Sequence, residues 1–350
     1  MAYASDALNE RKQIILKAIV NDYTSTAEPV SSEMLAYRYR LGVKPATIRN
    51  EMAEMSELGY LRQPHTSAGR VPSDMGYRFY VDWLMSGPGL SSAEEAKAVE
   101  GYANAPAETD ALLQLTCRLL STLTHYASIA TEPATNTATI RHISLSLMGG
   151  RNMLLAVVTS DGRVEHSILD LPSPTTHRRT ARLSNLLSEQ FGGLRIDSVQ
   201  SHNLDSAPEG ATDIASEYKM AVRALKRLVR EMCQGSVRLD GAGHILSQPE
   251  FKDIRKLEAL LLAFEERRLL YQTLNAAMNE ARSAIIIGNE NAYPEMRECS
   301  FVTATYRIGG RASGAIGVMG PTRMNYRRAV AAVNLLAQNL SELLTTISIG

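Results

Sequence analysis

The stretch from Lys44 to Arg70 constrains the fold more than any other, because a helical pattern is followed directly by a hairpin pattern. Pro45 suits the first turn of a helix, where its missing N–H has no intrahelical partner, and Gly59 is a usual stop signal. Between them, apolar residues recur at helical spacing on one face: Ile48, Met52, Met55 and Leu58. Residues 60–63 and 70–71 then predict two strands around a small, polar, basic loop. The stretch therefore predicts a helix with one buried face, followed by a two-stranded wing.

The opposite face of this helix carries residue types that can read a DNA groove. Asn can form two hydrogen bonds with adenine, Arg can pair with guanine or phosphate, and small residues let a helix approach closely. We therefore predict that five residues face the major groove: Lys44, Ala46, Thr47, Arg49 and Asn50. Taken alone, the pattern fits better with an ordinary amphipathic helix that has a polar outer face. The flanking stretches change that balance.

Both flanks favour DNA binding. Upstream, Ser31–Tyr39 predicts a short helix with a serine cap, and the turn 40–43 contains Gly42. Two helices joined in this way are typical of a helix-turn-helix. Downstream, the tip of the loop 64–69 suits contacts with phosphates or with a minor groove. The residues predicted to hold the DNA backbone or the adjacent groove are Arg38, Arg40, His65, Thr66, Ser67 and Arg70.

The charges indicate a positive face and not a basic domain. Residues 1–85 hold ten Lys and Arg against ten Asp and Glu, so a general attraction to polyanions is excluded. However, no acidic residue lies between Met34 and Asn50, where four basic residues gather. A second stretch without acids runs from Leu58 to Ser73. One-sided positive charge is the electrostatic pattern expected of a DNA-binding domain.

Composition places the chain among soluble cytoplasmic proteins. At 350 residues with 45% hydrophobic content, it suits two or three domains. Its 3 cysteines are widely separated and odd in number, which excludes a disulfide framework and suits a reducing cytosol. The N-terminus lacks the apolar core of a signal peptide, and the apolar runs are far short of the ~18–20 residues that cross a bilayer.

Templates for catalysis and for metal binding fail. The 7 histidines are scattered and form no HxH, HExxH or Cys/His cluster. The Gly-rich stretch 309–320 lacks the spacing of a phosphate loop, and no GxSxG motif is present. We therefore expect no enzyme activity, no catalytic residues, no cofactor and no bound metal.

The order of patterns predicts an α+β multidomain chain. Residues 86–89 (SGPG) are the clearest linker. Helices are predicted at 92–102, 109–130, 175–191, 212–233 and 250–280, the last with a break near Ala263. Strands are predicted at 138–148, 152–159, 163–171, 283–287, 300–308 and 312–319, and the Gly-rich patch 237–247 suits short strands. Strands on both sides of a helical block favour one sheet of five or six strands with an inserted module, and two consecutive α+β domains are the alternative.

Two further segments leave alternatives open. The aromatic residues of 72–85, including the sole tryptophan Trp83, favour packing of a helix over stacking on bases. In GPTRMNY (320–326), Pro321 is predicted to start the closing helix. Arg323 and Tyr326 then suit contact with an anion at the helix N-terminus or with a neighbouring subunit. A turn fixed by hydrogen bonds of the arginine is an equal alternative.

The run from Leu8 to Met85 closely resembles the heat-inducible transcription repressor HrcA family. The segments IIIGNEN from Ile285 and GAIGVMGPTRMNY from Gly314 match in the same order, so the resemblance spans nearly the whole chain. Lys44 departs from the family, which usually has a Ser-like cap there. The resemblance implies a winged helix-turn-helix DNA-binding domain (1–86), a GAF-like domain in two parts (90–172 and 281–350) and an inserted dimerisation domain (173–280).

The resemblance also implies a function. A member of this family is expected to be a dimeric repressor that binds an inverted-repeat operator, called CIRCE, upstream of the GroEL/GroES and DnaK chaperone operons. Heat shock relieves this repression, and the GroEL/GroES chaperonin modulates the active fraction of repressor. The alternative is a metabolite-responsive winged-helix regulator that senses a small ligand in its GAF-like domain.

Overall fold

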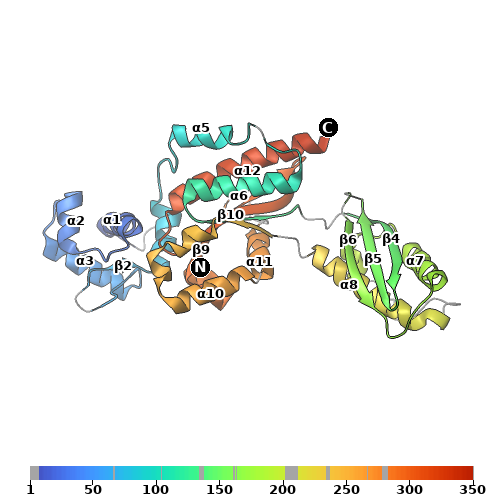
Figure 1. Cartoon of the computed structure of the whole chain (residues 1–350). Helices are drawn as coiled ribbons and strands as arrows, with labels where there is room; N and C mark the ends of the chain where they lie inside the picture. Colours follow the sequence, from blue (N-terminus) through green and yellow to red (C-terminus); the bar gives the residue numbers. More distant parts are fainter. Residues whose placement is uncertain are drawn as a thin grey trace. The chain divides into compact units, whose positions relative to one another are not determined.

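The computed structural model describes residues 8–65, 68–103, 105–133, 138–160, 162, 164–201, 212–233, 237–265, 267–277 and 283–349. It divides the chain into two compact units (Figure 1). Unit 1 comprises Met1–Glu132 and Val237–Gly350, and unit 2 comprises Pro133–Ser236. Together they form a mixed α/β structure.

Unit 1 begins with three helices and a short antiparallel hairpin. These elements are α1 (Glu10–Thr26), α2 (Ser32–Tyr39), α3 (Pro45–Glu57), β1 (Leu61–Arg62) and β2 (Val71–Pro72). The Ser31 side chain accepts a hydrogen bond from the N–H of Met34, which confirms the predicted cap of α2. Pro45 occupies the first turn of α3, also as predicted. The N-cap of α3 is Lys44, whose side chain makes no capping bond among the described residues.

The aromatic segment continues this region as α4 (Asp74–Phe79) and η2 (Tyr80–Leu84), a single π-helical turn. Tyr77, Phe79 and Tyr80 are buried, which confirms the packing alternative for these three side chains. Trp83 differs, because half of its surface is exposed.

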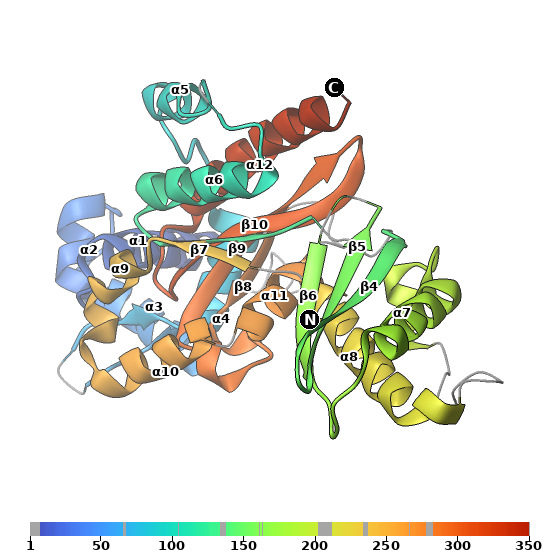
Figure 2. The same ribbon diagram turned by 45° about the vertical axis from the view of Figure 1, so that its right-hand side comes forward.

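The rest of unit 1 is built on a five-stranded antiparallel sheet, with the order β7-β3-β10-β9-β8 in the described part of the chain. Its strands are β3 (Ala127–Thr131), β7 (Val237–Asp240), β8 (Ala284–Ile287), β9 (Cys299–Ile308) and β10 (Arg311–Pro321). Figures 1 and 2 show helices α6 (Thr109–Thr124) and α12 (Tyr326–Ile349) side by side over β10. Helix α5 (Ser92–Glu100) packs beside them, while α9 (Ala242–Leu246), α10 (Ile254–Glu265) and α11 (Arg267–Ala277) lie on the other face.

Alternation along the strands separates two apolar cores. Ala304 and Ile316 pair across β9 and β10 and face the core that contains α6 and α12. Phe301 and Met319 pair in the same way and face the core that contains α10 and α11. The sheet is thus buried on both faces, as expected from a two-residue period.

Unit 2 holds a separate three-stranded antiparallel sheet in its described residues. Its elements are β4 (Ile140–Gly149), β5 (Asn152–Thr159), β6 (Val164–Asp170), α7 (His177–Phe191), η4 (Ile196–Gln200), η5 (Thr212–Ile214) and α8 (Ala215–Cys233). Leu155 of the central strand packs with Leu183 of α7 and Tyr218 of α8 in one buried cluster. Helices therefore cover one face of this sheet (Figure 2).

The prediction of a single sheet from strands at both ends of the helical block was wrong. The three strands at 140–170 pair only with one another among the described residues, and β3 and β7 complete the larger sheet instead. The predicted helix 109–130 ends at Thr124, because His125 adopts a left-handed conformation (φ 57°) and caps it. The Gly-rich patch supplies β7, as predicted, but continues as helix α9. The compact unit 133–236 accordingly differs from the predicted insertion at 173–280.

Two helix boundaries also differ from the prediction. Pro321 is the last residue of β10, and α12 begins at Tyr326. Asn325 caps that helix by accepting a hydrogen bond from the N–H of Arg328. The predicted helix 250–280 begins later, at Ile254, after the short 3-10 helix η6 (Pro249–Lys252). Residue 266, which separates α10 from α11 near the predicted break at Ala263, lies outside the described residues.

Candidate nucleic-acid interface

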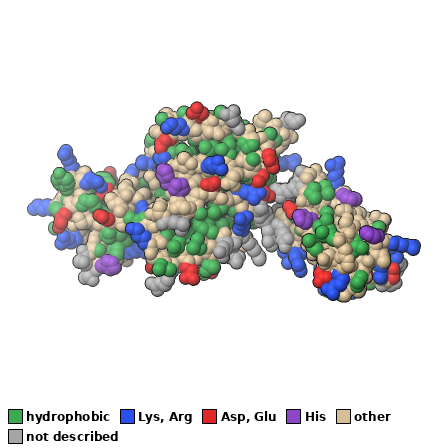
Figure 3. All heavy atoms as spheres, viewed as in Figure 1, with side chains coloured by type: hydrophobic (Ala, Val, Ile, Leu, Met, Phe, Trp, Pro, Cys, Tyr) green, Lys and Arg blue, Asp and Glu red, His purple; other side chains and the backbone are tan. Residues whose placement is uncertain are grey.

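Helix α3 presents its predicted outer face to solvent. Ile48, Met52 and Met55 are buried on the inner side of the helix. On the other side, Lys44, Ala46, Arg49 and Asn50 are exposed and Thr47 is half-buried. Figure 3 shows Lys and Arg side chains projecting from the end of unit 1 that α1, α2 and α3 form. The face is therefore free to approach a large partner.

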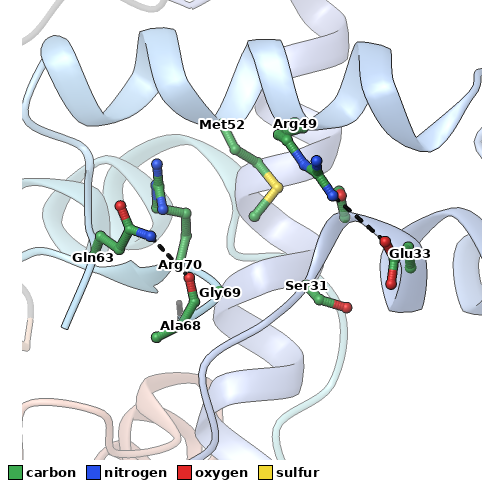
Figure 4. A pocket seen from close by; sticks show the side chains of 9 residues that line it. Ser31, Glu33, Arg49, Met52, Gln63, Ala68, Gly69 and Arg70 are labelled. Atoms are coloured by element: carbon green, nitrogen blue, oxygen red, sulfur yellow. Dashed lines mark hydrogen bonds and ion pairs between the residues drawn. The ribbon is translucent and has the colours of Figure 1, made fainter. Parts of the chain in front are cut away.

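A hollow of about 450 Å³ lies beside this face (Figure 4). Its walls come from the start of α2, from α3 and from the hairpin: Ser31, Ser32, Glu33, Arg49, Met52, Gln63, Ala68, Gly69 and Arg70. Arg49 and Arg70 stand on different walls of the hollow. Two guanidinium groups around a polar concavity are suited to an anionic ligand such as a phosphate.

The two arginines differ in how firmly they are held. Arg70 donates from Nε to the Ser56 hydroxyl at 2.9 Å, and its backbone pairs with Val30. Arg49 reaches Glu33 at 3.4 Å, and both side chains are more than 70% exposed. Exposed ion pairs of this kind contribute about 0–1 kcal/mol. Arg49 can therefore exchange Glu33 for another partner at little cost.

Gly69 lets the hairpin close against the start of α2. A side chain at this position would place its Cβ 2.2 Å from the carbonyl oxygen of Val30. The backbones of Val30 and Arg70 form two hydrogen bonds beside it, each 2.9 Å long. The glycine thus fixes the hairpin wall of the hollow relative to α2.

Arg38, predicted as a DNA contact, is paired within the protein. Its guanidinium donates to Asp22 Oδ1 at 2.5 Å, and the Tyr39 hydroxyl donates to the same oxygen at 3.1 Å. Asp22 is only 5% exposed, so it needs this compensation. Burial and the Asp22 carboxylate raise the pKa of Tyr39 to about 12.

The other predicted contacts lie around the same surface. Arg40 is exposed and ends α2 in a left-handed conformation (φ 45°). His65 is exposed at the hairpin, whereas Thr66 and Ser67 lie outside the described residues. Sequence reasoning missed Tyr37, which is 89% exposed. Tyr37 follows Glu33 by one helical turn, so the two side chains lie on the same face of α2. Because Glu33 pairs with Arg49 of α3, this spacing would have placed Tyr37 near the predicted DNA-binding face.

The predicted anion contact at the start of α12 is wrong. Arg323 is 9% exposed and pairs with Glu250, and Tyr326 is 1% exposed with its hydroxyl donating to Ser300 at 2.8 Å. Arg323 also donates to the carbonyl oxygen of Thr24 at 2.8 Å. The alternative of a turn fixed by arginine hydrogen bonds is therefore confirmed.

Comparison with known proteins places the chain in a family. The family model for the HrcA protein C terminal domain matches residues 110–330. A heat-inducible transcription repressor HrcA of Desulforamulus reducens is 38% identical over 343 residues, which cover 98% of this chain and 99% of that protein. The chain belongs to the HrcA family. A repressor of the same name from Symbiobacterium thermophilum is 37% identical over 336 residues, covering 96% and 98% of the two chains.

Membership confirms the predicted activity class. The curated relatives of this HrcA-family chain are named heat-inducible transcription repressors, so it is a negative regulator of transcription and not an enzyme. A crystal structure described as that of a hypothetical protein shares its fold, with a TM-score of 0.62 at 23% identity over 97% of this chain and 99% of that one.

The described residues contain neither a candidate membrane span nor a candidate metal site. No helix there has the length and apolar character needed to cross a bilayer. No group of three or more His, Cys, Asp or Glu residues in the same part of the chain could hold a metal ion.

Proposed function

We propose that α1 to β2 form a winged helix-turn-helix that binds an inverted-repeat operator, with one α3 helix in the major groove of each half-site. The exposed outer face of α3 beside an arginine-lined hollow carries this proposal. Its base-reading residues are Lys44, Ala46, Thr47, Arg49 and Asn50. Its backbone contacts are Tyr37, Arg40, His65, Thr66, Ser67 and Arg70. Arg38 is left out because Asp22 already engages its charge.

A titration with operator DNA tests these roles. Asn50→Ala should lower discrimination at one base pair of each half-site by about 1–3 kcal/mol, because the two hydrogen bonds of a bidentate pair with the base are removed. Arg70→Ala should weaken binding to all sequences and lower the salt dependence by about 0.9 for each phosphate that the protein no longer neutralises. Arg118→Ala, an exposed arginine on α6, is the matched control. Wild-type operator binding in all three variants would contradict the proposal.

The operator is proposed from family membership. We infer that the operator is a CIRCE-type inverted repeat upstream of the GroEL/GroES and DnaK operons. We also propose, from the same membership, that the five-stranded part of unit 1 is the GAF-like domain. Footprinting on the upstream regions of the organism's own chaperone operons tests this assignment. Protection that falls outside any inverted repeat would refute it.

We also propose that the repressor is a homodimer that pairs through the open face of the unit 2 sheet. Leu154 pairs with Ile168 and Val158 with Val164 on this face, and Ile168 and Val164 are about 60% exposed. Their neighbours on the face are Ser144, Ser146, Ala156, His142 and His166, and Asp170 pairs with Asn152 at its end. Because a twofold interface uses one patch on both subunits, a sheet face with several exposed apolar side chains suits a second copy of the chain.

Sedimentation of two β6 variants tests the dimer. Ile168→Lys should produce monomers, since it buries a charge in the interface. Glu165→Lys, an exposed substitution on the same strand but on the other face, should leave the dimer intact. A dimeric Ile168→Lys protein would refute this surface.

The chaperonin is the remaining proposed partner. A repressor of marginal stability can lose its DNA-competent form through a shift of a few kcal/mol. Adding GroEL/GroES to purified repressor should raise the fraction that binds operator after mild heating. An unchanged active fraction would refute this modulation.

A further inference from the structure

Two C-terminal segments contact the N-terminal DNA-binding region directly. These are residues 285–291 (IIIGNEN) and 320–326 (GPTRMNY) of unit 1. Among the described residues, no hydrogen bond or ion pair links either segment to the exposed face of α3. Their contacts instead reach α1 and α4, on the side of the region that packs against the larger sheet.

The first contact joins α4 to the loop after β8. Asp74 Oδ2 accepts hydrogen bonds from the backbone N–H of Asn289 at 2.9 Å and from its side-chain amide at 2.7 Å. Gly288 has φ 49°, and a Cβ there would lie 2.4 Å from the same oxygen. The loop is therefore shaped around the Asp74 carboxylate.

The second contact is a bidentate ion pair. Arg78 of α4 donates to both oxygens of Glu290, at 2.8 and 2.5 Å, and to the carbonyl oxygen of Ile285 at 2.6 Å. Glu290 also accepts from the backbone N–H of Ile287 at 2.8 Å, which orients its carboxylate. Two parallel hydrogen bonds restrict rotation as well as separation of the two groups, so this pair fixes the orientation of α4 relative to the loop after β8.

The third contact is made by Arg323, which joins its own segment to two others. It donates to the carbonyl oxygen of Thr24 near the end of α1 at 2.8 Å, to Gln248 at 2.9 Å, and to Glu250. Beside it, the rings of Tyr77 and Tyr326 pack with centroids 5.7 Å apart, and both residues are almost fully buried. Polar contacts on α1 and α4 thus surround a buried aromatic contact.

The predicted linker does not act as a free joint. Gly89 packs so closely on α12 that a Cβ would lie 2.2 Å from the carbonyl oxygen of Arg327. Arg327 also donates to the carbonyl oxygen of Ser86 at 3.3 Å. The orientation of α3 is therefore set by packing against the larger sheet and not by a flexible tether.

We propose that Arg78, Asp74 and Arg323 are positioning residues that determine which spacing between half-sites the repressor accepts. This inference rests on the proposed function as a dimeric DNA-binding protein. In a dimer, the spacing of two recognition helices must match the spacing of the half-sites. Contacts that hold α3 on the five-stranded sheet remove one source of freedom between the two recognition helices, so releasing the DNA-binding region should widen the range of spacings that the dimer accepts.

Operators with altered spacers test the inference. Inserting two base pairs moves one half-site by roughly 7 Å and turns it by roughly 70°. We expect the wild-type protein to bind the altered operator at least about 10-fold more weakly than the native one. Arg78→Ala and Arg323→Gln should reduce this preference to about 3-fold or less. Their binding to a single half-site should stay within about 2-fold of wild type, since neither residue lies on the α3 face.

Arg328→Ala is the matched control. Arg328 also combines an ion pair, to Glu94 at 2.5 Å, with a bond to a main-chain oxygen, that of Leu123, but it joins α12 to α5 and α6. It should keep the wild-type spacer preference. Should Arg323→Gln fail to fold, Arg78→Ala still tests the inference because its ion pair is partly exposed.

The outcomes separate the spacing inference from the proposed function. Wild-type preference retained in Arg78→Ala, or a wild-type protein that binds all spacers equally, overturns the inference and leaves the proposed function standing. A wild-type protein that binds no inverted repeat overturns both.

Discussion

The pairing of Arg38 with Asp22 can be tested against its sequence-based role as a DNA contact. Asp22 is 5% exposed in the wild type, and in Arg38→Ala its carboxylate would keep only the Tyr39 hydroxyl, at 3.1 Å, as a donor. Its second oxygen, Oδ2, already has no hydrogen-bond partner among the described residues. The substitution therefore leaves a buried negative charge almost uncompensated.

The expected cost follows from burial. Removing one partner of a fully buried pair costs about 3–5 kcal/mol. The Arg38 side chain is 55% exposed, so solvent weakens the interaction and we expect about 1–3 kcal/mol. For folding units of this size, that loss corresponds to a fall in Tm of roughly 2–12 °C. Arg38→Ala/Asp22→Asn should recover more than half of it, because a neutral amide needs no cation.

Urea unfolding followed by the fluorescence of Trp83, the only tryptophan, reports on this region. Arg40→Ala is the control, because Arg40 adjoins Arg38 and is exposed. Arg40→Ala should unfold as the wild type does. The slope of log K for operator binding against log salt concentration should fall by about 0.9 for each subunit that binds. If Arg38→Ala keeps the wild-type urea midpoint and shows that fall instead, the structural role of Arg38 is refuted.

Two further predictions concern the hairpin and the acid stability of unit 1. Gly69→Ala should destabilise the DNA-binding region by about 1–3 kcal/mol, since its Cβ would overlap the Val30 carbonyl, whereas Gly243→Ala, with nothing within 4 Å, should be neutral in the same thermal melt. Hydrogen bonds from Ser91 and Arg328 lower the pKa of Glu94 to about 2. Its stabilising contribution is therefore complete above pH ~4.5 and is lost as the pH falls toward 2, so the difference in Tm between wild type and Glu94→Gln should shrink between pH 5 and 3. A constant difference over that range would contradict this assignment.

Local signals predicted the DNA-binding region well because its cues are short-range. The cap at Ser31, the start of α3 at Pro45 and its buried face at Ile48 each depend on neighbours within a few residues. The prediction of the larger sheet was wrong because strand pairing depends on residues far apart in the chain. Strand β3 is buried along its whole length, with Ser128 and Thr131 among its apolar residues, so it shows no regular two-residue alternation and does not stand out from the helix before it. Its partner β7 is more than 100 residues away in the chain, and nothing local specifies that pairing.

The charged residues of the candidate site were also predicted without knowledge of partners that are distant in the sequence. The sequence places Arg38 in a stretch without acids, but Asp22 reaches it from α1 across the fold. Likewise, Arg323 resembles an anion-binding residue at a helix start, and its actual partners lie about 75 and about 300 residues earlier. An arginine's role depends on whether folding brings a carboxylate to it, and periodicity carries no information on that.

The pairing of the α3 acids explains how a neutral chain can present a positive surface. Glu51 and Glu54 lie on the same helix as Arg49, and on their own they would repel DNA phosphates. Lys12 of α1 lies 2.7 Å from Glu54 and 3.6 Å from Glu51, and Arg11 lies 3.5 Å from Glu51. These pairs direct the acidic side of α3 toward α1, while Lys44 and Arg49 remain exposed on the other side. Because charges separated by more than about 8–10 Å are largely screened at physiological salt, a nearby phosphate responds to the exposed cations and not to the zero net charge of the whole chain.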